Sequence, residues 1–227
     1  MGDPLRDRRY PVAGALARLG LVMGLALAPG EVRAHPHAFI DGGLDFVFDA
    51  EGRLSALRVT WIYDPFTSLF LLEDLGIEAN ETAEMSAAQR AELAAYQTTW
   101  DAGFAGDSTL SHDGARMGLS GPVDAEAEIR DGQVVIRFTR AVETPFRPGA
   151  DTIAMAYDPG YFTAYAITEA PRLEGAAEGC RVRVEPFEPA GMLVALQERL
   201  LSLPVDAAPE DPDVGALFAD RIHVACD

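Results

Sequence analysis

The stretch AFIDGGLDFVFDAEGRLSALRVTWIY, residues 38–63, alternates apolar and polar side chains on both sides of a short turn. The apolar residues fall on even positions before the turn and on odd positions after it: Ile40, Leu44, Phe46, Phe48, then Leu57, Val59, Trp61, Tyr63. A period of two is typical of strands with one buried face. With the Gly-containing turn between them, the two runs predict an antiparallel β-hairpin.

Asp-Gly pairs at Asp113-Gly114 and Asp131-Gly132 each separate two alternating runs, which is a strong signal for further hairpins. Residues 152–167 are expected to form another hairpin, joined at Asp158-Pro159-Gly160, with its tyrosines packed against it: Tyr157, Tyr161 and Tyr165. The remaining expected elements are helices at 66–76, 86–104 (with Ser86 as N-cap), 190–203 and 213–220, and strands at 180–187 and 221–226.

These patterns predict an α+β fold of mainly antiparallel β-sheets, packed like a sandwich, with a few peripheral helices. We expect residues 35–227 to form a single domain, a length that suits one hydrophobic core. Repeating βαβ units are not seen in the sequence, which argues against a two-lobed solute-binding protein.

The first 34 residues have the layout of a secretory signal peptide. A basic start containing Arg8-Arg9 precedes the apolar run LGLVMGLALAPG, and VRA supplies small residues at the cleavage site. The apolar run is shorter than the roughly 20 residues that a membrane-spanning helix needs. We therefore expect export to the periplasm, cleavage after Ala34, and no insertion of the mature chain in the membrane; the sequence leaves open the general and the twin-arginine route.

The formal net charge is −18, and every basic residue is an arginine. Such a charge repels nucleic acid and anionic lipid and concentrates cations near the surface. The absence of lysine from the sequence excludes a Schiff base and a P-loop lysine. The sequence also contains no Gly-x-Ser-x-Gly or His-Glu-x-x-His motif, so an enzymatic function is not favoured.

Cys180 and Cys226 are the two cysteines of the chain. In an exported protein, an isolated pair is most simply explained by one disulfide that ties the C-terminal segment to the body. Binding of a metal by two thiolates is the less favoured alternative in an oxidising compartment.

His35 and His37 would stand at the head of the mature chain, on either side of Pro36. Because alternate side chains of a strand share a face, both histidines and Asp41 are expected on the face opposite Leu44. Two imidazoles on one strand face lie about 6 to 7 Å apart, close enough to converge on one ion. The free α-amine of His35 could add a third nitrogen, an arrangement that resembles a histidine brace and suits copper.

This donor set predicts a transition-metal site of His35, His37 and Asp41, for zinc, nickel, cobalt or copper. His112 and His223 are weaker ligand candidates: His112 adjoins a turn, and His223 alternates with Ile222 and Val224 and so faces away from the core side of the last strand. Incidental surface histidines remain the alternative. The segment LGIEANETAEM, residues 75–85, lacks the full oxygen-ligand pattern of a calcium loop.

Four segments together resemble a known family: AHPHAFIDGGLDFVFDAEGRLSALRVTWIYDPF, YDPGYFTAYAI, RLEGAAEGCRVRV and DPDVGALFADRIHVAC. The family consists of bacterial exported proteins of unknown function, catalogued as the periplasmic component of an uncharacterised ABC-type transport system. Its genes often lie beside nickel/cobalt-type metal permeases or efflux proteins. The resemblance implies a role in handling transition-metal ions in the periplasm. Within the matching segments, the His-Pro-His motif assigns this role to His35 and His37.

The leading hypothesis is therefore a non-enzymatic periplasmic metal-binding accessory protein that serves a membrane metal permease or efflux protein. One rival is a copper-dependent oxidase or oxygenase built on the N-terminal brace. The other is a periplasmic interaction domain in which the histidines bind no metal.

Overall fold

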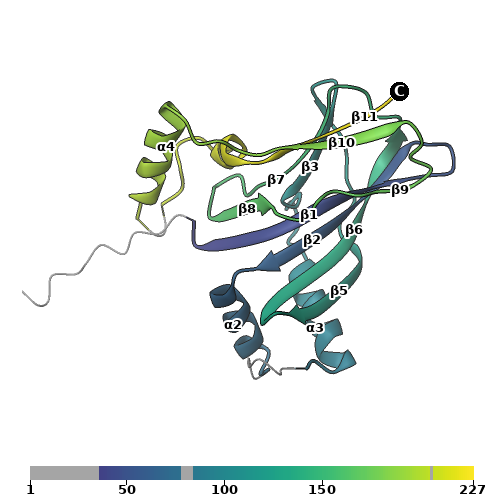
Figure 1. Cartoon of the computed structure of the whole chain (residues 1–227). Helices are drawn as coiled ribbons and strands as arrows, with labels where there is room; N and C mark the ends of the chain where they lie inside the picture. Colours follow the sequence, from purple (N-terminus) through teal and green to yellow (C-terminus); the bar gives the residue numbers. More distant parts are fainter. Residues whose placement is uncertain (1–35, 78–83, 205–206) are drawn as a thin grey trace, which may run out of the picture. The chain divides into compact units, whose positions relative to one another are not determined.

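The predicted hairpin lies in the middle of the larger of two β-sheets (Figure 1). Strands β1 (Ala38–Phe48) and β2 (Leu54–Tyr63) pair antiparallel, with Leu44 opposite Val59 and Phe46 opposite Leu57. All four of these side chains are fully buried, as the alternation predicts. The structure, a computed structural model, describes residues 36–77, 84–204 and 207–227.

The larger sheet has the strand order β5-β6-β2-β1-β8, and β9 also pairs with β1. Strands β8 and β9 run parallel to β1, whereas the other pairings are antiparallel. The additional strands are β5 (Val123–Arg130), β6 (Gln133–Phe146), β8 (Thr163–Ile167) and β9 (Leu173–Gly175). The short strand β9 is not among the predicted elements.

The smaller sheet has the order β10-β11-β7-β3-β4, with all pairings antiparallel. Its strands are β3 (Ser108–His112), β4 (Ala115–Arg116), β7 (Thr152–Ala156), β10 (Cys180–Glu185) and β11 (Arg221–Cys226). One buried cluster contains Phe46 and Phe138 from the larger sheet and Leu110 and Ile222 from the smaller one. Both sheets therefore contribute to a shared core, which confirms the predicted sandwich-like α+β fold.

Helices lie at the margins, as predicted. Helix α2 (Pro65–Asp74) packs on β6 and helix α3 (Ala87–Thr98) on β5. Ser86 caps α3 in a reciprocal capping box with Gln89, which confirms the predicted N-cap. Helix α4 (Met192–Leu201) and the 3₁₀ helix η1 (Val214–Phe218) form a second, smaller apolar cluster with Tyr161.

Both Asp-Gly turns form as predicted. Asp113 and Gly114 have φ of 49° and 77°, and Asp131 and Gly132 have φ of 53° and 78°. Two consecutive residues with positive φ match the right-handed twist of the strands that they connect. The first turn joins β3 to β4 and the second joins β5 to β6.

The prediction of a hairpin over residues 152–167 is wrong. Strand β7 pairs with β3 and β11 in the smaller sheet, whereas β8 pairs with β1 in the larger one. The connection turns because the Asp158 carboxylate accepts hydrogen bonds from the backbone N–H groups of Gly160, Phe162 and Thr163, at 3.0, 2.7 and 3.0 Å. The segment therefore carries the chain from one sheet to the other.

The predicted signal peptide, residues 1–34, and His35 lie outside the described residues. Among the residues that are described, no helix is both long and apolar enough to cross a membrane. The predicted domain boundary stays a prediction.

Candidate functional site

His37 occupies a defined position at the head of β1. Its backbone N–H donates to the carbonyl oxygen of Phe162 at 2.7 Å, and its imidazole ring stacks on the Phe162 ring at 5.9 Å with an interplanar angle of 15°. Phe162 is held in turn by the Asp158 carboxylate. The His37 side chain is exposed, so it is both anchored through its backbone and accessible from solvent.

The face of β1 that carries Asp41 is only partly open to solvent. Asp41 is exposed, as the alternation predicts. Asp45, on the same face, is buried and accepts hydrogen bonds from the Arg172 backbone at 2.9 Å and from the Arg172 guanidinium at 2.6 Å. The Asp45 carboxylate therefore forms a structural ion pair with Arg172, which the alternation of the strand did not predict.

The two other candidate histidines lie in the smaller sheet. His112 is half-buried, and its Nδ1 lies 2.8 Å from Thr152 Oγ1. His223 is also half-buried, with Nε2 3.2 Å from the Glu185 carboxylate, in an orientation that makes no hydrogen bond.

His112 is paired in register with Thr152, and His223 with the next residue of β7, Ile153. Successive residues of a strand point to opposite faces, so the two histidines lie on opposite faces of the sheet and cannot share an ion. Within residues 36–77, 84–204 and 207–227, no group of three His, Cys, Asp or Glu residues is arranged to hold a metal. Of the predicted ligands, His37 and Asp41 lie in this part of the chain and His35 does not.

A buried polar cluster lies where the loop before β3 meets β8. The Tyr165 hydroxyl donates a hydrogen bond to the Asp107 carboxylate. Burial raises the pKa of Asp107 to about 6, with a further contribution from the charge of Asp158, whereas Tyr165 and Arg140 oppose the rise. Burial and the nearby Asp107 also raise the pKa of Tyr165 and of Tyr63.

Asp107→Asn is expected to remove a pH-dependent loss of stability. The folded state holds the Asp107 proton up to about pH 6, whereas the unfolded chain releases it near 3.8. Because the folded form is the stronger proton binder at this group, the contribution of Asp107 to stability is greatest below about pH 4 and is lost as the pH rises to about 6. At pH 7 the variant, which has no charge to bury, is expected to be about 2 kcal/mol more stable than the wild type.

Thermal unfolding between pH 4 and 7 measures this effect. Asp151→Asn, which changes an exposed carboxylate, is the matched control and is expected to keep the wild-type pH dependence. If the thermal stability of Asp107→Asn depends on pH in the same way as that of the wild type, the assignment of this titration to Asp107 is wrong.

Arg140 is the most extensively bonded charged side chain in the space between the sheets. It is 3% exposed and donates to the carbonyl oxygens of Ser120, Ser108 and Ala105 at 2.8, 2.7 and 2.7 Å, and to the Ser108 hydroxyl at 3.0 Å. Its guanidinium lies 5.0 Å from the centre of the Trp100 ring. Burial lowers the pKa of Arg140 to about 10.

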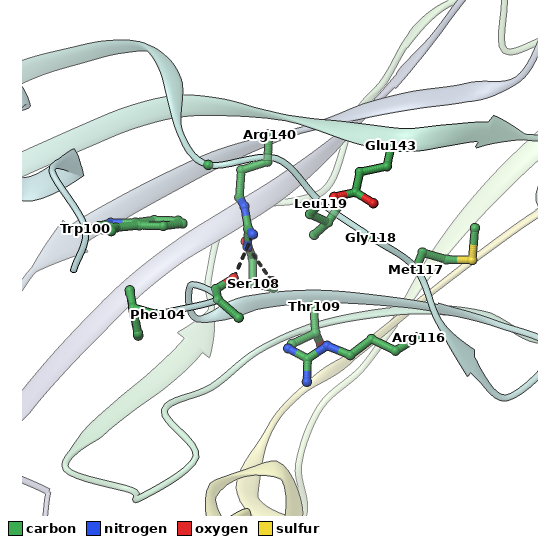
Figure 2. A pocket seen from close by; sticks show the side chains of 12 residues that line it. Trp100, Phe104, Ser108, Thr109, Arg116, Met117, Gly118, Leu119, Arg140 and Glu143 are labelled. Carbon is green, nitrogen blue, oxygen red and sulfur yellow. Dashed lines mark hydrogen bonds between the residues drawn. The ribbon is translucent and has the colours of Figure 1, made fainter. Parts of the chain in front are cut away.

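Arg140 forms part of the wall of a pocket of about 400 Å³ (Figure 2). Arg140 is not among the site residues predicted from the sequence, although its position in β6 is informative. The buried residues Val134, Ile136 and Phe138 fall on even positions of that strand. The same alternation places Arg140 on the core face, where an arginine must find partners for its charge and its N–H groups.

The disulfide between Cys180 and Cys226 is confirmed. The two cysteines lie directly opposite each other in β10 and β11, so the bond joins the strand that ends the chain to its neighbour. Disulfides are typical of proteins that fold in an oxidising compartment, which fits an exported protein.

Comparison with known proteins supports the assignment of the chain to a family of unknown function. No curated protein matches the chain. The family model described as "Protein of unknown function (DUF1007)" matches residues 20–226, which covers every strand and helix described above. The chain therefore belongs to the DUF1007 family.

Proposed function

We propose that this protein is a periplasmic accessory protein that binds a transition-metal ion through His35 and His37 and serves a membrane metal permease or efflux protein. The observation that carries the proposal is the state of His37, which is exposed and yet fixed in position. A ligand that is already oriented loses less conformational entropy when it binds a metal than one on a mobile chain end.

The donor atoms that would complete the site belong to His35. The imidazole and the α-amine of a mature N-terminal His35 would stand two positions from His37, beyond the described residues. Nitrogen donors of this kind suit zinc, nickel, cobalt and copper. When bound, the ion would be held as cargo or as a fixed centre.

Asp41, predicted from the sequence as a third ligand, contributes charge in this proposal. The two residues are four positions apart, which in a fully extended chain separates their Cα atoms by about 13 Å; β1 begins at Ala38, one residue after His37. An exposed carboxylate at that distance attracts a cation without contacting it. The net charge of −18 acts in the same direction over the whole surface.

An exposed apolar surface next to this site supports a protein partner. Helix α2 exposes Phe66 and Phe70, 78% and 63% accessible, and β1 exposes Phe39, 56% accessible. Two hydrogen bonds connect these elements: Phe39 N–H donates to the Asp64 carboxylate, and Asp64 N–H donates to the Phe39 carbonyl. Large exposed aromatic side chains that gather in this way mark interaction surfaces.

His37→Ala is expected to weaken metal binding by about tenfold or more, because one of the proposed nitrogen ligands is lost. Titration of the mature protein with Zn²⁺, Ni²⁺, Co²⁺ and Cu²⁺, in competition with a chromogenic chelator, measures the affinity for each ion. The mature N-terminus must begin at His35, without a tag, because the α-amine is part of the proposed site.

His112→Gln and Asp41→Asn are the controls. The first removes a histidine that lies in the other sheet and should leave the affinity unchanged. The second removes the charge but no proposed ligand atom and should have a small effect that disappears at high salt. Equal affinities for the wild type and His37→Ala would contradict the proposal.

A further inference from the structure

The pocket beside Arg140 lies between the two sheets, and His37 is not among its lining residues. Strand β6 provides Arg140 and Glu143, β3 provides Ser108 and Thr109, and β4 provides Arg116. Figure 2 shows the Arg140 guanidinium reaching from β6 across to Ser108, with Trp100 and Phe104 on one side of it. The volume of about 400 Å³ falls in the range of sites that hold small organic molecules.

One end of the pocket is apolar. The rings of Trp100 and Phe104 lie 5.3 Å apart with an interplanar angle of 81°, and Phe104 is 46% exposed. Met117 and Leu119 add flexible and branched apolar surface to the lining. A flat or branched hydrocarbon group placed there would cover aromatic surface that now faces solvent.

The other part of the pocket carries positive charge. Arg140 has five N–H groups, of which four donate to the oxygens of Ala105, Ser108 and Ser120. These acceptors are neutral; the charge of the Asp107 carboxylate also attracts Arg140, but burial has the larger effect and lowers its pKa. Arg116 adds a second guanidinium at the exposed rim, where it interacts with the Tyr157 hydroxyl.

Two guanidinium groups in one pocket are notable on a protein with a net charge of −18. The attraction of Asp107 does not offset the cost of burying the Arg140 guanidinium, and an anion that enters the pocket would reduce that cost. Glu143 also lines the pocket, and its carboxylate rests against the backbone of Gly118. This negative charge disfavours ligands with several anionic groups and leaves a single carboxylate as the best match.

We propose that this pocket binds a small organic monocarboxylate, with its apolar end against Trp100 and Phe104 and its carboxylate held by Arg116 and the remaining N–H of Arg140. A carboxylate can accept two hydrogen bonds from guanidinium groups, which gives a stronger and more directional contact than a neutral acceptor. The site shares no residue with the proposed metal site, so each proposal can fail without the other.

Binding of 3-phenylpropanoate to the mature protein tests the proposal, with 2-phenylethylamine and 3-phenylpropanol as the cationic and neutral counterparts. Isothermal titration calorimetry is expected to show one saturable site for 3-phenylpropanoate. The neutral alcohol is expected to bind about tenfold more weakly, because it loses the charge-assisted hydrogen bonds. The amine, which would face two guanidinium groups, is expected not to bind measurably.

Arg116→Gln and Phe104→Ala change exposed residues of the pocket and should therefore leave folding intact. Each is expected to weaken binding of 3-phenylpropanoate about fivefold or more, whereas Arg181→Gln, a change at an exposed arginine paired with Asp227, should have no effect. Glu143→Gln should bind at least as tightly as the wild type. Absence of saturable binding, equal binding of the alcohol or the amine, or an unchanged affinity of Arg116→Gln would overturn the proposal.

Discussion

Replacement of Cys180 and Cys226 by serine is expected to lower the free energy of unfolding by about 4 kcal/mol. The disulfide closes a loop with a sequence separation of 46 residues and therefore restricts the unfolded chain. It also holds the end of β11, the strand that connects β10 to β7 in the smaller sheet. Urea unfolding of the double variant and the wild type measures the difference.

Reduced wild-type protein is the natural control, because it lacks the bond and keeps both sulfur atoms. It should unfold at the same urea concentration as the double serine variant. If the oxidised wild type, the reduced wild type and the variant unfold together, the disulfide does not stabilise the fold. In that case the C-terminal strand would be held by its backbone pairing alone.

Arg140→Met is expected to lower the free energy of unfolding by about 3 kcal/mol. The variant keeps much of the side-chain volume but leaves the carbonyl groups of Ala105, Ser108 and Ser120 without their donor. Relief of the desolvation that lowers the pKa of Arg140 offsets part of this loss. The net effect remains large because one side chain connects three separate segments.

Arg137→Met is the matched control for this variant. Arg137 lies on the same strand, but on the other face, and forms an ion pair with Glu128 at 2.9 Å near the surface. Exposed ion pairs contribute little, so this substitution should cost about 1 kcal/mol or less. If Arg140→Met costs no more than Arg137→Met in chemical unfolding, the proposed role of Arg140 between the sheets is wrong.

Local pattern was enough to predict most of the strands and helices. The alternation over residues 38–63 predicted the central hairpin, and the Asp-Gly pairs predicted both tight turns, because each of these features depends on a few neighbouring residues. The side chain of Ser86 and the amide of Gln89 likewise act within one helical turn. Such features are local in the sequence and can be recognised in it.

The pairing of strands that are distant in the sequence could not be predicted in the same way. Residues 152–167 have the alternation of two strands, but alternation does not specify which neighbour each strand joins. The hydrogen bonds that Asp158 accepts, and the positive φ of Tyr161, turn the chain toward the other sheet. The partner of β8 is β1, more than a hundred residues earlier.

The candidate sites show the same division. The exposure of Asp41 follows from strand parity, whereas His37 lies one residue before β1, where parity does not fix the direction of its side chain. The stacking of the His37 ring on Phe162 could not be inferred from the sequence, because Phe162 belongs to a distant loop. The pocket beside Arg140 was missed for the same reason, because its lining comes from four separate segments of the chain.

Native mass spectrometry of the protein recovered from the bacterial periplasm, after expression with its leader and without added metal, tests the central claim most directly. We expect the mass of residues 35–227 with one disulfide, plus one transition-metal ion that is absent from the His37→Ala variant. A metal-free wild-type protein in metal-replete cells, or an ion that persists in the variant, would contradict it.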